Sequence, residues 1–261
     1  MLGAIAGDII GSPYESPRIR KKTKEFPLFS DRSRFTDDTV LTVATAAAII
    51  NKCGYGAAYK KWGNKYPSAG YGGSFRKWLS KEKVEPYNSW GNGSAMRVSP
   101  VGWAFKTLER TLKEAKASAK VSHNHPEGIK GAQATACAVF MSRKCNSKKD
   151  IKSYIEEKFD YNLSATTDKI RPNYSFKVSC QGSVPEAIIA FLDSKNLEDA
   201  IRTAVSLGGD ADTQAAISGS IAEAYYKNIP ESIKKEILKR LDKDILKVIE
   251  SFSQETDYGI F

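Results

Sequence analysis

Small and apolar residues recur at helical spacing in most segments of this chain, which favours an α-helical fold. The clearest example is the segment 39–50, TVLTVATAAAII, in which Val40 and Val43 fall on one helical face. Strand patterns are weak: residues 174–178 alternate polar and apolar side chains only briefly, and either a strand or a merely extended segment fits them. No strand–helix alternation and no repeat is visible. We predict an all-α protein, a single compact orthogonal helical domain over residues 1–261.

Other segments carry helix signals of their own. Residues 131–141 are rich in Ala, and residues 213–226 have small residues at 218–220 that suit close packing. Ser183 and Glu186 form an S-x-x-E capping box, which predicts a helix over residues 187–192. After Pro230 the apolar residues form one stripe with lysines opposite. The members of that stripe are Ile233, Ile237, Leu241, Ile245, Leu246 and Ile249.

Composition excludes several classes of protein. Hydrophobic residues make up 41% and charged residues 27%, as in ordinary globular proteins. No apolar run approaches the roughly 20 residues that a membrane helix needs. Residues 1–10 are apolar, but Asp8 and the break at residues 11–13 (GSP) argue against a signal peptide. The four cysteines form no C-x-x-C pair, so we expect reduced thiols and a cytoplasmic protein.

Charge and histidine content constrain the ligands. Only His123 and His125 are present, so a zinc site rich in His or Cys is not expected, and any metal would take oxygen ligands. The net charge is +10, from 40 Lys and Arg against 30 Asp and Glu. We favour a Lys-rich solvated surface because the lysines are spread over many segments. Attraction to a polyanion, such as nucleic acid or a phosphate-bearing substrate, is the alternative.

Two acidic motifs precede predicted helices: residues 36–38 (TDD) and residues 210–213 (DADT). Each alone is explained by helix capping and the helix dipole. If both helix starts meet, however, four aspartates come together, with Glu15 as a fifth acid, and their repulsion costs several kcal/mol without a cation. Hard oxygen ligands select Mg²⁺ or Mn²⁺. Gly208 and Gly209 would let the backbone approach a ligand closely.

A glycine-rich loop follows Trp90. Residues 91–97 (GNGSAMR) have the composition of a loop that cradles phosphate with backbone N–H groups, although a plain turn fits equally well. Residues 70–74 (GYGGS) give a similar and weaker signal. Trp90 could stack on a base, but an isolated Trp is more often part of a core.

Taken in order, these motifs resemble the ADP-ribosylglycohydrolase family. The resemblance rests on residues 3–8 (GAIAGD) with Glu15, the two acidic motifs, the glycine-rich loop and Ser122-His123, and it runs from Leu2 to about Pro230. It implies an all-α fold with two Mg²⁺ or Mn²⁺ ions in a cleft. The residues that match the family's metal ligands are Thr36, Asp37, Asp38, Asp210, Asp212 and Thr213.

The resemblance also implies roles in catalysis and binding. Glu15 matches a mobile acid near the metals, and Glu15, Asp37 or Asp38 would move the proton during hydrolysis, with the choice among them open. The family's diphosphate contacts are matched by Gly72, Gly91, Asn92, Gly93 and Ser94, and positions near its adenosine end are matched by Trp90 and His123.

These matches predict an ADP-ribosyl-hydrolase that cleaves the anomeric bond between ribose and a conjugate. We favour an ADP-ribosylated protein side chain as substrate and expect a monomer that does not bind membranes. ADP-ribosylated nucleic acid is the second candidate substrate. A module that binds ADP-ribose without turning it over is the alternative from another class. Arginine, serine, a nucleic-acid base or phosphate, and free ADP-ribosyl compounds all remain open as leaving groups.

Overall fold

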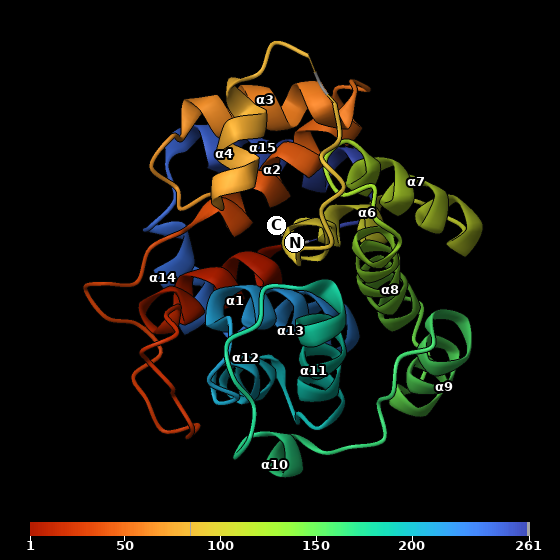
Figure 1. Cartoon of the computed structure of the whole chain (residues 1–261). Helices are drawn as coiled ribbons and strands as arrows, with labels where there is room; N and C mark the ends of the chain where they lie inside the picture. The colour runs from red at the N-terminus through yellow and green to blue at the C-terminus, as the bar shows by residue number, and fades with distance from the viewer. Residues whose placement is uncertain (84, 260–261) are drawn as a thin grey trace.

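The computed structural model describes residues 1–83 and 85–259, and within these residues the regular structure is helical (Figure 1). The prediction of an all-α protein is confirmed. The elements are α1 (Leu2–Gly11), η1 (Ser12–Tyr14), α2 (Asp37–Ile50), α3 (Tyr55–Lys65), α4 (Gly73–Ser80), α5 (Gly93–Met96), α6 (Ser99–Ala104), α7 (Leu108–Lys120), α8 (Pro126–Arg143), α9 (Lys148–Phe159), α10 (Thr167–Ile170), α11 (Cys180–Leu192), α12 (Leu197–Val205), α13 (Ala211–Tyr226), α14 (Glu231–Leu238) and α15 (Lys243–Glu255).

Glycines on α1 let it pack directly against the backbone of α13. A Cβ atom placed on Gly7 would lie 2.1 Å from the carbonyl oxygen of Ala215, and one on Gly3 would lie 2.3 Å from that of Gly219. Contacts this short leave room only for hydrogen at these positions. The predicted close packing of residues 218–220 is confirmed, and it brings the end of α1 beside the start of α13.

The helices form two groups around the starts of α2 and α13. Figure 1 shows α2, α3, α4 and α15 in the upper group and α1, α11, α12 and α13 in the lower group. The N-terminal turns of α2 and α13 carry the two acidic motifs. Because residue Asp8 of α1 also reaches the start of α2, three helices meet where the acids lie.

Two helix boundaries differ from the sequence prediction. α11 begins at Cys180 rather than at residue 187, so Ser183 is not an N-cap, and its hydroxyl donates to the carbonyl oxygen of Ser179 at 2.7 Å. The tertiary reason is that the N–H of Cys180 donates to Trp90, which fixes the helix start against the glycine-rich loop. The stripe after Pro230 is split into α14 and α15, because Asp242 caps a new helix.

Residues 174–178 form no strand. They are extended, and the one β-type contact found among the described residues is an antiparallel bridge between Gly91 and Ser179. This bridge holds the extended segment against the glycine-rich loop. Cys137 is buried, as expected, and all four cysteines are free thiols. In the described part of the chain, no helix is both long and apolar enough to cross a membrane.

Candidate metal centre and ligand cleft

A cavity of about 310 Å³ lies between the starts of α2, α5 and α13. Its acidic end is formed by residues of the two acidic motifs and by Glu15, and loops that precede α4, α5 and α8 line the cavity beside these acids. The described residues that line it include Glu15, Asp37, Asp38, Gly70, Gly72, Tyr87, Gly91, Asn92, Gly93, Arg97, His123, Phe176, Val178, Asp210, Asp212 and Thr213. The fold therefore joins segments that are far apart in sequence into one site.

Carboxylates converge at the acidic end of this cleft. One oxygen from each of Glu15, Asp210 and Asp212 lies within 4.8 Å of the others. Burial, followed by the charges of Asp8 and other neighbouring carboxylates, raises the pKa of Asp38 well above its ordinary value, and it raises the pKa of Asp37 to about 8. A cluster of acids that repel one another in this way needs a cation to be fully ionised.

Asp8 is a member of this cluster that sequence analysis did not select. Its side chain is fully buried and accepts hydrogen bonds from the N–H and hydroxyl groups of both Thr36 and Thr39, at 2.5–3.0 Å. These bonds fix the first turn of α2, and this turn orients Asp37 and Asp38 toward the cleft. The signal available in the sequence was a single acid within residues 2–11, a segment that is otherwise apolar. The structure buries this whole segment.

The cluster fits divalent cations by the chemistry of its donors. Oδ2 of Asp38 is buried without a hydrogen-bond partner. Among residues 1–83 and 85–259, no Lys or Arg forms an ion pair with any carboxylate of the cluster. Buried oxygens that lack both donors and counter-charges are the ligand set that Mg²⁺ or Mn²⁺ takes.

The glycine-rich loop is tied to the acids. Nδ2 of Asn92 donates to Oδ2 of Asp210 at 2.8 Å, and its backbone N–H donates to the carbonyl oxygen of Val178. The N–H of Gly91 donates to the hydroxyl of Ser89. Two of the N–H groups that the phosphate-cradle prediction relied on are therefore used inside the protein. Asn92 acts here as a link that orients Asp210.

Three of the predicted site residues do not line the cleft. Thr36 is buried and its hydroxyl donates to Asp8. The buried hydroxyl of Ser94 donates to the carbonyl oxygen of Gly128 at 2.7 Å. Trp90 is 53% exposed and its ring packs edge-on against His125, so it belongs neither to the core nor to the cleft wall.

Several residues of the cleft were missed by sequence analysis. Tyr87 lies beside His123, with ring centroids 5.8 Å apart, and Phe176 and Val178 come from the extended segment before α11. No local pattern marks them. Phe176 and Val178 are held beside the cleft by the bridge between Gly91 and Ser179, and the N–H of Tyr87 donates to the carbonyl oxygen of Ser122.

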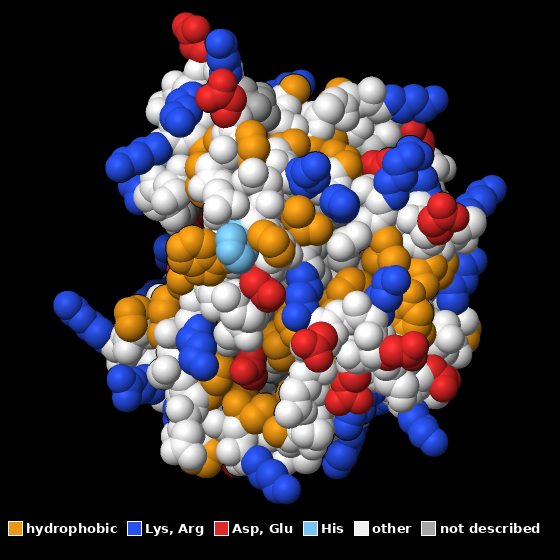
Figure 2. Space-filling model, turned by 45° about the vertical axis from the view of Figure 1, so that its right-hand side comes forward, with side chains coloured by type: hydrophobic (Ala, Val, Ile, Leu, Met, Phe, Trp, Pro, Cys, Tyr) orange, Lys and Arg blue, Asp and Glu red, His pale blue; other side chains and the backbone are white. Residues whose placement is uncertain are grey.

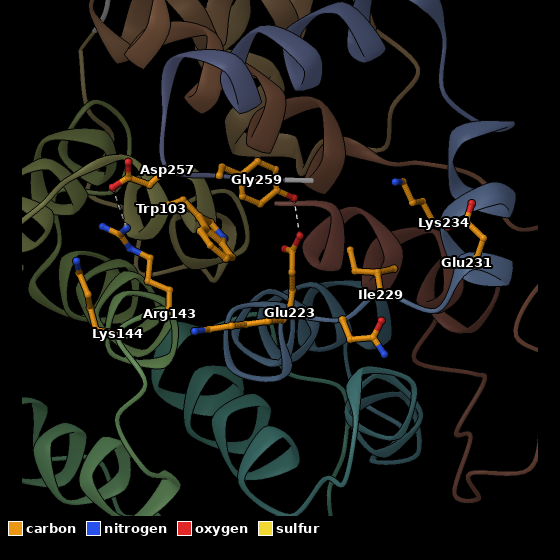
Figure 3. Close-up of a pocket in the computed structure, with 12 residues that line it drawn as sticks. Trp103, Arg143, Lys144, Glu223, Ile229, Glu231, Lys234, Asp257 and Gly259 are labelled. Carbon is orange, nitrogen blue, oxygen red and sulfur yellow. Dashed lines mark hydrogen bonds and ion pairs between the residues drawn. The ribbon is translucent and has the colours of Figure 1, made fainter. Parts of the chain in front are cut away.

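A larger cavity, of about 560 Å³, lies near the other end of α13 (Figure 3). Its wall includes Glu223, which is eleven residues after Asp212 and so about 16 Å along the helix. Glu223 accepts a hydrogen bond from the Tyr258 hydroxyl at 2.5 Å, and Arg143 lies 3.8 Å from Asp257. Figure 3 shows Arg143 facing Asp257. Because Glu223 and Asp257 have partners, these two acids differ from the unpaired carboxylates that mark the cleft.

Comparisons with known proteins show what the whole chain is similar to. A family model described as ADP-ribosylglycohydrolase matches residues 1–258. The chain is 25% identical to ADP-ribosylhydrolase ARH3 of Bos taurus, covering 89% of this chain and 86% of that protein. It is 23% identical to ADP-ribosylarginine hydrolase Tri1 of Pseudomonas putida, covering 87% and 69%. A solved structure called an ADP-ribosylglycohydrolase-related protein complex superimposes with a TM-score of 0.71 at 21% identity, covering 97% of this chain and 95% of that one.

Proposed function

Because this chain belongs to the ADP-ribosylglycohydrolase family, we propose that it is a metal-dependent hydrolase that releases ADP-ribose from ADP-ribosylated protein side chains. Its relatives ARH3 and Tri1 are named as hydrolases of ADP-ribosyl groups, and this chain is a hydrolase of the same kind. The observation that carries the metal dependence is the convergence of Glu15, Asp210 and Asp212 in the cleft, beside the unpartnered oxygen of Asp38.

Two divalent cations, Mg²⁺ or Mn²⁺, would be held by oxygens of both acidic motifs. The proposed ligands are Thr36, Asp37, Asp38, Asp210, Asp212 and Thr213. When bound, the cations would neutralise these carboxylates and polarise the oxygens of a substrate ribose. Thr36 would contribute through the lone pairs of its hydroxyl oxygen, because the hydroxyl hydrogen is donated in a hydrogen bond to Asp8.

The acids differ in what they can do with a proton. Glu15 is exposed, follows η1, and stands between Pro13 and Pro17, so it is the carboxylate best placed to meet the leaving group. Partial enclosure, followed by the charge of Asp210, raises the pKa of Glu15, which favours a carboxyl that holds a proton and can give it up. Asp37 and Asp38 are deeper and would accept a proton from the attacking water.

The cleft would bind the rest of ADP-ribose away from the reacting carbon. Gly72, Gly91 and Gly93 line the cleft beside the acids, and Tyr87, Phe176 and Val178 offer apolar walls for a ring. Binding energy from these remote contacts would position the anomeric carbon against the acids and exclude water from it.

A panel of conjugates tests the proposal. ADP-ribosylated peptides modified on serine or on arginine, and ADP-ribosylated oligonucleotides, would be incubated with the full chain and Mg²⁺ or Mn²⁺, and free ADP-ribose would be measured. We expect release from a peptide, and none from the variant Asp212→Ala. Tight binding of ADP-ribose with no release from any conjugate would instead assign a binding module.

One observation favours ADP-ribosylated nucleic acid as a second candidate. Residues 16–34, which follow Glu15, include the exposed cations Arg18, Arg20, Arg32 and Arg34. Against it, Figure 2 shows Lys and Arg scattered among Asp and Glu rather than gathered into one patch on the visible face. A scattered distribution is typical of a solvated surface, so the protein substrate is favoured.

A further inference from the structure

Arg97 is a fully buried cation without a carboxylate partner among the described residues. Its guanidinium lies over the ring of Tyr59, 4.2 Å from the centroid, and its Nε and Nη1 atoms have no hydrogen-bond partner. A cation this deeply buried is costly to keep unless it serves a structural or functional contact. The hydrogen bonds that it does make are to Ser118 and Ser122.

Those contacts determine how Ser122 bonds to His123. Nη2 of Arg97 donates to the hydroxyl oxygen of Ser122 at 2.9 Å and to the carbonyl oxygen of Ser118 at 3.1 Å. The same Ser122 hydroxyl lies 2.8 Å from Nδ1 of His123. Arginine can only donate, so Ser122 accepts from Arg97 and its own proton remains for Nδ1. Were Nδ1 the donor, the Ser122 proton would have no acceptor among the described groups.

These bonds favour the tautomer of His123 with its proton on Nε2. Burial, followed by the charge of Arg97, also lowers the pKa of His123 well below its usual value, which keeps the ring neutral. The side chain is 4% exposed and lines the cleft. Nε2 is not one of the fully enclosed polar atoms that lack a partner, so it is open to the cleft, where a ligand can accept its hydrogen bond.

The glycine-rich loop leaves this donor uncovered. A Cβ atom on Gly93 would lie 3.2 Å from Nε2 of His123, and one on Gly91 would lie 3.6 Å from it. A side chain at either position would cover Nε2. Glycine at both keeps the donor open to the cleft at the loop proposed to face the diphosphate.

We propose that Arg97 and Ser122 are positioning residues that hold His123 as the neutral Nε2–H tautomer, so that Nε2–H donates to a diphosphate oxygen of ADP-ribose. The identity of the ligand rests on the proposed function, whereas the tautomer does not. The hydrogen bonds that run from Arg97 through Ser122 to His123 form a relay. This relay differs from an ordinary phosphate site, in which a cation touches the anion. Arg97 also lines the cleft, but its unpartnered Nε and Nη1 atoms are enclosed, so the cation acts through Ser122 and the neutral ring makes the contact.

The tautomer is tested directly by NMR. The chain has two histidines, so long-range ¹H–¹⁵N correlations of ¹⁵N-labelled protein resolve both rings, and the variant His125→Gln assigns them. We expect an unprotonated Nδ1 and a protonated Nε2 for His123, and a mixture of tautomers in Ser122→Ala. A proton on Nδ1 in the unaltered protein overturns the proposal. Removal of Arg97 risks unfolding, so Ser122→Ala carries the test.

Binding of ADP-ribose in the presence of Mg²⁺ tests the role of the donor. His123→Ala should raise the Kd about tenfold, and Ser122→Ala about threefold or more, as expected for loss or misorientation of one hydrogen bond. His123→Gln, which keeps an N–H near the position of Nε2, should recover part of the loss. Ser118→Ala is the matched control, because Arg97 bonds only to the carbonyl of Ser118, and its Kd should not change.

The double variant separates a relay from a general structural effect. If Ser122 acts through His123, then Ser122→Ala should change the Kd less than twofold when His123 is already Ala. An equal loss in both backgrounds overturns the relay. If the unaltered chain binds no ADP-ribose, the proposed function and the diphosphate contact both fail, and the NMR result still decides the tautomer.

Discussion

Two buried aspartates at the acidic end of the cleft have opposite surroundings. Asp8 accepts hydrogen bonds from the backbone and hydroxyl donors of Thr36 and Thr39, so both of its oxygens have donors within the protein. Asp38 has one oxygen with no donor at all. The first residue thus stabilises the turn that begins α2, and the second is left for a ligand.

Paired substitutions at these two residues should act in opposite directions. Asp8→Asn places an NH₂ group against donors and should destabilise the chain by about 2 to 4 kcal/mol. Asp38→Asn removes a charge that its neighbours repel and should leave the Tm in chelator unchanged or raised, while ADP-ribose release with Mg²⁺ is lost. Thermal unfolding in EDTA and an activity assay measure both. Equal destabilisation by the two would show that Asp38 has a structural role.

Glu15 should matter for turnover more than for binding of product. It is exposed at the cleft mouth, and its carboxyl is proposed to move a proton. Glu15→Gln keeps the shape and should lower kcat by about 100-fold or more, the size of a lost proton transfer. The Kd for ADP-ribose should change by less than about tenfold, or ~1.4 kcal/mol. Comparable losses in kcat and affinity would make Glu15 an ordinary binding residue.

At the scale of elements, the packing of α1 on α13 determines where the acids meet. Asp8 lies on α1 and Asp212 on α13, and the two helices approach closely because α1 has Gly3, Gly7 and Gly11 on one face. A change in the packing of these two helices would therefore move Asp8 and Asp212 relative to each other.

Substitution of one glycine tests this packing. A Cβ on Gly7 would lie 2.1 Å from a backbone oxygen that cannot rotate away, so Gly7→Ala should destabilise the chain by at least about 2 kcal/mol. Gly54→Ala is the matched control: Gly54 is exposed, and its Cβ would meet nothing within 4 Å. Its effect should stay within about 0.5 kcal/mol. Urea unfolding compares the two, and a tolerated Gly7→Ala would refute the close approach.

Helix boundaries could be predicted where local residues determine them. Thr36 caps α2 with its own side chain, and the Ala-rich segment that follows is helical as expected. The start of α11 could not be predicted, because the donor that fixes it, the N–H of Cys180, bonds to Trp90, 90 residues away in the chain. A local capping box at Ser183 gave the wrong start for this reason.

At the scale of the whole molecule, sequence analysis found the acids but not their support. The two acidic motifs could be selected because each is a local cluster of ligand-type residues, whereas the role of Glu15 came from the family resemblance. Asp8, Arg97 and Tyr87 could not be assigned, since their roles depend on which helices pack together. The ordinary residue types in these positions give no signal until the fold joins them.

The surface charge should matter for one substrate class only. The net charge is +10, and the cations are spread over the visible face (Figure 2). For an ADP-ribosylated peptide, kcat/KM should change little between about 50 and about 300 mM salt, because few counterions are released. Comparison with an oligonucleotide conjugate checks this. A steep fall limited to the oligonucleotide, with faster turnover of it at low salt, would make nucleic acid the preferred substrate.

Metal dependence is the most direct test of the proposed hydrolysis. Release of ADP-ribose from an ADP-ribosylated peptide would be measured after exhaustive treatment with EDTA, and again after addition of Mg²⁺ or Mn²⁺, with Asp212→Ala in parallel. The convergent carboxylates predict loss of activity on chelation, rescue of the unaltered protein by either ion, and no rescue of the variant. Full activity after chelation would contradict the metal centre.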